Sequence, residues 1–274
     1  MPRFLDNCDM TSNHQKMPVL FIGHGNPMYA IEPNTYSTAW GREGKLLPKP
    51  KAILAISAHW VTEGTSVTAM EHPETIHDFG GFPQALFDVQ YSAPGSLALA
   101  KQVKALIKSR EVELDDKNWG IDHGAWAVLK SLFPNADVPV VQLSLDMRLS
   151  SEEHYELAKE LKDLRRQGIL IVASGNVVHN LRLVDFGGTQ QYPWATRFNE
   201  YFKAELLAGR HQHLIKPEQI GDEALISNPT WEHYWPALYA LGLQDDDDQV
   251  EIITDGIDLG SISMLSFKLA SSPT

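Results

Sequence analysis

Short apolar runs alternate with amphipathic helical patterns along this chain. The clearest runs cover residues 19–22, 52–56, 138–143 and 169–173. Continuous apolar runs of this length are typical of strands that are buried on both faces. The sequence therefore predicts an α/β fold, in which a central, mostly parallel sheet is covered by helices on both faces.

Polar residues that cap helices mark where the helical patterns begin. Ser96 and Asp122 each precede a pattern, which ends near residue 109 or 133, and Ser150 forms a capping box with Glu153 before a helix that should end at Gly168. Further helices are expected over residues 196–207 and 230–241. Short strands are expected at residues 112–114, 250–254 and 261–268, and the last two form an antiparallel pair.

Composition limits the classes of partner. The formal net charge of -12 over 274 residues makes nucleic acids and anionic membranes poor partners. The single cysteine, Cys8, excludes an internal disulfide, and no apolar run is long enough to span a bilayer. We expect a flexible tail over residues 1–16, one catalytic domain over residues 17–274, and a cytoplasmic location. The aspartate run at residues 245–248 is expected to be a solvated loop.

Three histidines follow strand-like runs that end in small residues. They are His24 in I-G-H-G, His59 in S-A-H-W and His179 in S-G-N-V-V-H. Because the carboxyl ends of parallel strands meet at one edge of a sheet, we expect these imidazoles to converge. Imidazole is the commonest protein metal ligand, and an open three-histidine site suits catalysis. The alternative for each is a hydrogen-bonded structural role, and His72 and His154 are expected on the solvated surface.

At these residues the chain resembles the DOPA 4,5-dioxygenase family of the type III extradiol ring-cleaving dioxygenases. The resemblance covers about residues 17–269, in segments such as G-H-G-N-P, S-A-H-W, T-I-H-D-F-G-G-F-P, D-H-G-A-W, S-G-N-V-V-H-N-L-R and S-N-P-T-W-E-H-Y-W-P. It implies an enzyme with one divalent metal that opens catechol rings with dioxygen. The implied partners are these two small molecules, and the chain is expected to be a monomer or a small homo-oligomer.

The resemblance implies roles for five histidines. His24, His59 and His233 match metal ligands. His179 matches the active-site histidine, which acts as an acid/base or as a fourth ligand. His123 matches a substrate-side histidine and is also expected to be catalytic.

The implied ligand set leaves the identity of the metal open. In the wider superfamily the third ligand is usually a glutamate, which gives the two-histidine, one-carboxylate set of iron(II) oxygenases. Here the matching position is His233, and the adjacent Glu232 should point about 100° away on a helix. Ring cleavage implies iron(II), whereas an all-histidine set also suits zinc.

Four further residues are candidates for substrate binding. Asp78 lies in a glycine-rich loop that can wall the pocket, and Asn176 follows a strand-like run. Trp60 and Tyr234 can stack on an aromatic ring, although both can equally be core residues. Asp122 either orients His123 or caps its helix.

Two other functions use the same residues. One is a zinc-dependent hydrolase with His179 as its base. The other is a non-catalytic, metal-binding interaction protein, because a fold does not by itself imply a function.

Overall fold

The computed structural model describes residues 16–188 and 190–271, and its centre is an eight-stranded sheet. In chain order its strands are β1 (Val19–Gly23), β2 (Ala52–Thr62), β3 (Thr65–Thr68), β4 (Val112–Asp115), β5 (Val140–Asp146), β6 (Ile169–Gly175), β7 (Asp248–Thr254) and β10 (Ser266–Ser271). Their spatial order is β4-β3-β5-β2-β6-β1-β10-β7. Strands β1, β6, β2 and β5 are parallel to one another. Strand β10 pairs antiparallel with β1 on one side and with β7 on the other. The predicted mostly parallel sheet with an antiparallel C-terminal pair is confirmed.

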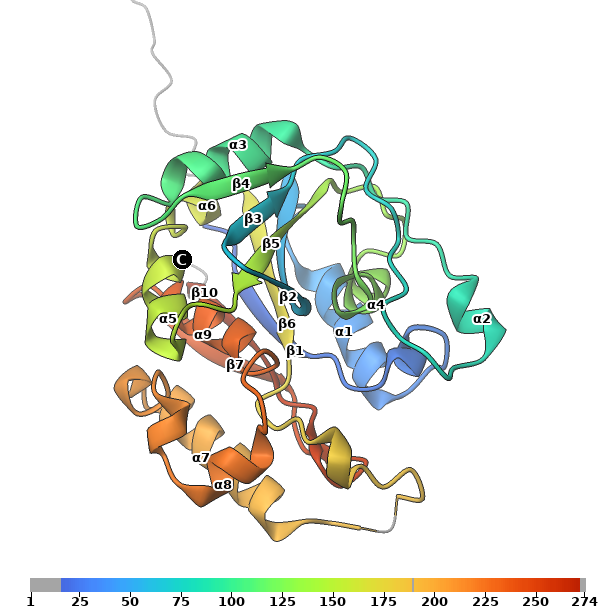
Figure 1. Cartoon of the computed structure of the whole chain (residues 1–274), viewed down its shortest axis with the longest axis vertical. Helices are drawn as coiled ribbons and strands as arrows, with labels where there is room; N and C mark the ends of the chain where they lie inside the picture. The colour runs from blue at the N-terminus through green and yellow to red at the C-terminus, as the bar shows by residue number, and fades with distance from the viewer. Residues whose placement is uncertain (1–15, 189, 272–274) are drawn as a thin grey trace, which may run out of the picture.

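Helices cover both faces of this sheet. They are α1 (Thr35–Leu46), α2 (Gln84–Phe87), α3 (Leu97–Leu106), α4 (His123–Leu132), α5 (Ser151–Lys159), α6 (Asp163–Arg166), α7 (Pro193–Leu207), α8 (Asp222–Ser227) and α9 (Trp235–Gly242). In Figure 1, α1 and α4 lie on one side of the sheet and α5, α6 and α9 on the other. Alternate β1 side chains enter different cores: Phe21 packs in one and Leu20 in the other. This two-sided burial explains why the strands read as continuous apolar runs.

Three predicted helix starts, at Ser96, Asp122 and Ser150, are confirmed, whereas the helices expected from residues 196 and 230 begin at Pro193 and Trp235. The side chains of Ser96 and Asp122 accept hydrogen bonds from the first turns of α3 and α4. Ser150 and Glu153 form the capping box of α5. For Asp122, the capping role is therefore the observed one. Pro236 lies in the first turn of α9, where its missing N–H is not needed.

Some predicted elements differ from the structure. The helix expected over residues 150–168 is two helices, α5 and α6. The strand expected over residues 261–268 is split into β9 (Ile262–Ser263), which pairs with β8 (Ile257–Asp258), and β10. The chain leaves the ladder between them at Met264, whose carbonyl accepts a hydrogen bond of 2.6 Å from Thr254 Oγ1. Helix α1 was not predicted, because only Trp40 and Glu43 on it are buried and no apolar stripe results.

The aspartate run at residues 245–248 is not the plain solvated loop that was predicted. Asp248 is buried and accepts two hydrogen bonds from the fully buried Arg165, at 2.5 Å from Nη1 and 2.9 Å from Nη2. Arg165 also donates to the carbonyls of Met17 and Leu243, both at 2.8 Å. One guanidinium therefore joins α6 to the chain before β1, the end of α9 and the start of β7. The partner lies 83 positions away, so the local run gives no sign of this burial.

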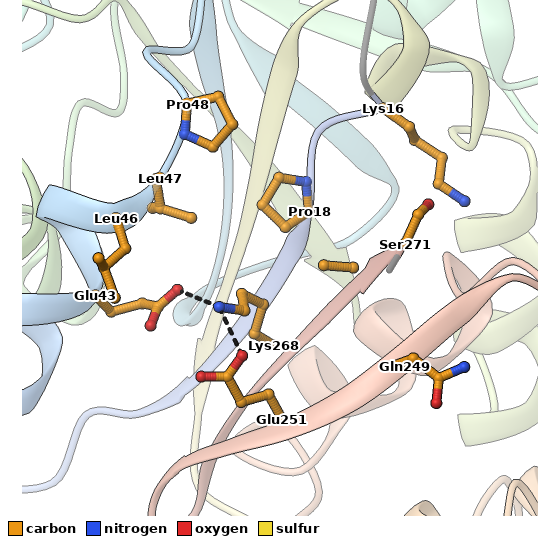
Figure 2. A pocket seen from close by; sticks show the side chains of 11 residues that line it. Lys16, Pro18, Glu43, Leu46, Leu47, Pro48, Gln249, Glu251, Lys268 and Ser271 are labelled. Carbon is orange, nitrogen blue, oxygen red and sulfur yellow. Dashed lines mark hydrogen bonds and ion pairs between the residues drawn. The ribbon is translucent and has the colours of Figure 1, made fainter. Parts of the chain in front are cut away.

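A second ionic contact fixes α1 across the antiparallel edge of the sheet. Figure 2 shows Lys268 of β10 between Glu43 of α1 and Glu251 of β7, and each Nζ–carboxylate distance is 2.8 Å. Lys16, at the start of the described chain, pairs with Asp245 and Asp247. The rest of the tail predicted over residues 1–16 lies outside the described residues. Within the described ranges, none of the helices has the length and apolar character needed to cross a bilayer.

We expect Arg165→Met to lower the free energy of unfolding by about 3–5 kcal/mol, because it leaves the buried Asp248 carboxylate with only Lys16 and one backbone N–H as partners. Urea denaturation measures this loss. The double variant Arg165→Met with Asp248→Leu should be more stable than the single variant, since it also removes the buried charge that has lost its guanidinium. A double variant that is less stable than Arg165→Met would contradict a cost that comes from the buried carboxylate.

Candidate functional site

Three imidazoles from distant parts of the chain converge at the carboxyl edge of β1, β2 and β6. His24 directly follows β1, His59 lies within the long strand β2, and His233 precedes α9. One ring nitrogen of each lies within 4.8 Å of the others. The Nε2 atoms of His24 and His59 are 3.3 Å apart. The hydrogen bond of 2.8 Å from the Asn176 N–H to the His233 carbonyl brings the start of α9 to the end of β6.

Hydrogen bonding fixes the tautomer of His24. Ser174 Oγ lies 3.0 Å from His24 Nδ1 and donates its only proton to the Gly124 carbonyl at 2.5 Å. The hydroxyl can therefore only accept from the ring, so the His24 proton lies on Nδ1. This leaves the Nε2 lone pair of His24 directed into the cluster.

Carboxylates have the same effect on the other two rings. Asp78 Oδ2 lies 3.1 Å from His59 Nδ1, and Glu232 Oε1 lies 3.2 Å from His233 Nδ1. An ionised carboxylate has no proton to give, so each ring must carry its proton on Nδ1. The Nε2 lone pairs of His59 and His233 are then free, and among the described residues the buried His233 Nε2 has no hydrogen-bond partner.

These three lone pairs fit one divalent cation. Without a cation or a proton between them, the facing Nε2 lone pairs of His24 and His59 repel each other. Burial, together with the neighbouring histidines, lowers the pKa of both His24 and His233 well below the usual range, so neutral imidazoles are favoured. Three neutral imidazoles are the donor set of an open metal site, which keeps positions for other ligands.

His179 stacks face to face on His233. The ring centroids are 3.4 Å apart and the planes differ by 6°. The nitrogen lone pairs lie in the ring planes, so two parallel, stacked rings do not direct them at one common point. Although His179, Glu232 and His233 also lie within 4.8 Å of one another, this geometry disfavours His179 as a ligand of the same ion. Burial and the nearby His59 and His123 lower its pKa to about 3.

His123 flanks the cluster from the first residue of α4. Its ring centroid is 3.9 Å from that of His59, and its Nδ1 is 2.9 Å from Asp78 Oδ1. Its backbone N–H donates to the same oxygen at 3.0 Å. Burial lowers the pKa of His123, and the Asp78 carboxylate opposes that shift. For Asp78, burial favours the neutral acid, but its contacts with the two histidines outweigh burial and hold its pKa well below the usual range.

The four residues expected to bind substrate have different surroundings. Both carboxylate oxygens of Asp78 contact histidines. Asn176 is buried and donates to the Ser263 carbonyl at 2.8 Å. Trp60 is buried in a stack with Trp119, with planes at 5°. Tyr234 is a core residue, and its hydroxyl donates to a backbone carbonyl.

Sequence reasoning did not identify several residues around the histidines. Ser174 and Glu232 act on ligand rings through Nδ1, and Phe79 packs edge-on against His123 at 5.3 Å. For Ser174, the only hint in the local sequence was its position in S-G-N at the end of β6. His72 is exposed as expected, whereas the expectation for His154 was wrong, because this ring is buried between Trp235 and Tyr239.

The comparisons with known proteins agree with one another. Residues 18–268 match the family described as the catalytic LigB subunit of aromatic ring-opening dioxygenase. A protein of Escherichia coli (strain K12) named 4,5-DOPA dioxygenase extradiol is 50% identical over 264 residues, covering 95% of this chain and 97% of that protein. A Beta vulgaris protein of the same name is 36% identical over 270 residues, covering 96% of this chain and 100% of its own length.

The fold has a counterpart of known structure. The crystal structure of an uncharacterized protein from Escherichia coli K12 matches with a TM-score of 0.82 at 44% identity, covering 93% of this chain and 100% of that one. Both the family match and the relatives extend over nearly the whole sheet and all five histidines of the site. The chain therefore belongs to the LigB family of aromatic ring-opening dioxygenases and is an oxidoreductase that cleaves aromatic rings.

Proposed function

We propose that this enzyme opens the ring of a catechol, DOPA or a related compound, beside its two hydroxyl groups, with dioxygen as the oxidant and one metal held by His24, His59 and His233. The observation that carries the proposal is the convergence of one ring nitrogen from each of three histidines within 4.8 Å, while Ser174, Asp78 and Glu232 lie at their Nδ1 atoms. The names of the Escherichia coli and Beta vulgaris relatives support the substrate class. A cytoplasmic location remains part of the proposal.

Iron(II) is the metal we propose for the working enzyme, although zinc fits the same three imidazoles. When bound, the metal supplies Lewis acidity and open positions at which both reactants are held together. His24, His59 and His233 present only neutral nitrogen donors. These neutral ligands would not offset the charge of a bound cation. The full charge would then favour a catechol that has lost a proton.

His179 is the residue that we propose as general base. Its ring lies against His233, beside the cluster, so a neutral imidazole lies next to the position where the catechol would be held. His123 lies on the opposite flank, with its Nδ1 at Asp78. We assign His123 to the substrate side, where a proton on a ring nitrogen can be donated to an oxygen of the opening ring.

His59→Ala should lose most of its bound metal, whereas His179→Ala should retain it. The reason is that His59 directs an Nε2 lone pair into the cluster, while the stacked His179 ring does not. Metal content after anaerobic loading with Fe²⁺ measures the difference, and the exposed His72→Ala is the control. Equal metal loss in both variants would mean that His179 is a ligand of the same rank.

The wild-type enzyme, loaded with Fe²⁺ without air, should consume oxygen when a catechol such as DOPA is added and should form a yellow ring-opened product. His179→Gln should lower kcat by about 10²–10⁴-fold, the usual contribution of a positioned acid or base. An oxygen electrode and visible absorbance follow both quantities.

The same assay separates the competing functions. A zinc hydrolase would act on its substrate with zinc and without oxygen uptake. A metal-binding interaction protein would bind the ion and turn over neither oxygen nor catechol. Absence of oxygen uptake by protein that demonstrably carries Fe²⁺, over a range of catechols, would refute the proposed reaction.

A further inference from the structure

The Asp78 carboxylate is shared by two histidines that have different proposed tasks. Its Oδ2 lies 3.1 Å from Nδ1 of His59, a proposed metal ligand. Its Oδ1 lies 2.9 Å from Nδ1 of His123, the proposed substrate-side histidine, and accepts the His123 backbone N–H at 3.0 Å. Among the close carboxylate contacts of the five site histidines, Asp78 bridges two rings, whereas Glu232 contacts His233 alone.

The contacts determine where the protons of both rings lie. A proton on the ring nitrogen removes the repulsion between two lone pairs that lie about 3 Å apart, so a nearby carboxylate favours the Nδ1–H tautomer. We therefore assign the proton to Nδ1 in both His59 and His123, although the His123 N–H does not point straight at the oxygen. Both Nε2 lone pairs then face away from Asp78. For His59 that direction is the cluster, where its Nε2 meets His24.

The loop that carries Asp78 is fixed to the segment that carries His123. Thr75 and Ile121 form a parallel bridge, and the Ile76 N–H donates to the Ile121 carbonyl at 2.8 Å. The indole N–H of Trp126, in α4, donates to the Ile76 carbonyl at 2.8 Å. The loop that carries the carboxylate is thus held by a backbone hydrogen bond before α4 and by an indole hydrogen bond from its first turn.

We propose that Asp78 is a positioning residue that holds His59 in the tautomer required for the metal and His123 in the matching tautomer on the substrate side. The assignment of the two tasks rests on the proposed function. Both oxygens of Asp78 already face the two rings. A carboxylate behind a metal-bound imidazole fixes the orientation of the ring and raises its basicity, and loss of such a partner typically weakens metal binding by about 10–100-fold.

Asp78→Asn tests this role, because the amide has the same shape but only one oxygen acceptor for the two rings. The matched control is Asp115→Asn. Asp115 is buried and likewise accepts hydrogen bonds from its loop, from Lys117 N–H at 3.1 Å and Asn118 N–H at 2.8 Å, but it has no contact with the five site histidines. Both variants lose a carboxylate that organises a loop, so a purely structural effect should appear in both.

The first measurement is Co²⁺ affinity, by competition with a chromophoric chelator and from the visible bands of the bound ion. Asp78→Asn should bind Co²⁺ about 10–100-fold more weakly than the wild type, whereas Asp115→Asn should stay within about threefold. Affinity of Asp78→Asn within that same threefold range would overturn the proposal. At saturating Fe²⁺, Asp78→Asn should also lower kcat by about tenfold or more with less effect on KM, because His123 loses its orientation.

The second measurement starts from the wild type, so its first result does not depend on a variant that folds. Long-range ¹H–¹⁵N NMR of the metal-free wild type reports which nitrogen of each ring carries the proton. His59 and His123 should both appear as Nδ1–H, and at least one of them should change in Asp78→Asn. A wild-type His59 with its proton on Nε2 would overturn the proposal. Neither Co²⁺ binding nor NMR uses catechol or oxygen, so a chain that passes both tests but consumes no oxygen would refute the proposed function and not the role of Asp78.

Discussion

The site depends on where three protons are kept. Ser174, Asp78 and Glu232 hold them on the Nδ1 atoms of His24, His59 and His233, so that three Nε2 lone pairs face one another. This arrangement is unfavourable by itself, because like partial charges approach to 3.3 Å between His24 and His59. The rest of the fold compensates for it: rigid strands and a helix terminus position the rings and leave them no freedom to turn away. A divalent cation held by these three rings would replace that repulsion with attraction to their lone pairs.

Close backbone approach makes this geometry possible at two glycines. A Cβ on Gly124, in the first turn of α4, would lie 2.5 Å from Ser57 Oγ and 2.7 Å from the His59 ring. A Cβ on Gly175, at the end of β6, would lie 2.3 Å from the His233 carbonyl. Larger residues would push α4 away from β2 and α9 away from β6. Glycine is therefore required in D-H-G and S-G-N, because any side chain would occupy the space into which the neighbouring atoms pack.

The sequence predicted those parts of the site that local pattern determines. His24 and His59 follow or end apolar strand runs, so parallel-sheet geometry was enough to bring them together. His233 follows no strand, and its place depends on a backbone contact with Asn176, so only the family resemblance identified it. The bridging role of Asp78 and the burial of Asp248 against Arg165 join segments far apart in the chain. Local polarity suggested a pocket wall for one and a solvated loop for the other, because polarity does not report a distant partner.

The proposed ligand set of three histidines differs in charge from a set of two histidines and one carboxylate. A two-histidine, one-carboxylate set returns one negative charge to the ion, whereas His24, His59 and His233 return none. In this chain the carboxylates contact the histidines from behind. Asp78 lies 3.1 Å from His59 Nδ1, and Glu232 lies 3.2 Å from His233 Nδ1. Two negative charges behind the ligands can balance a divalent cation at longer range, with a weaker pull on it. A divalent ion held there would be a stronger Lewis acid, while the two carboxylates would bring the site as a whole close to neutral.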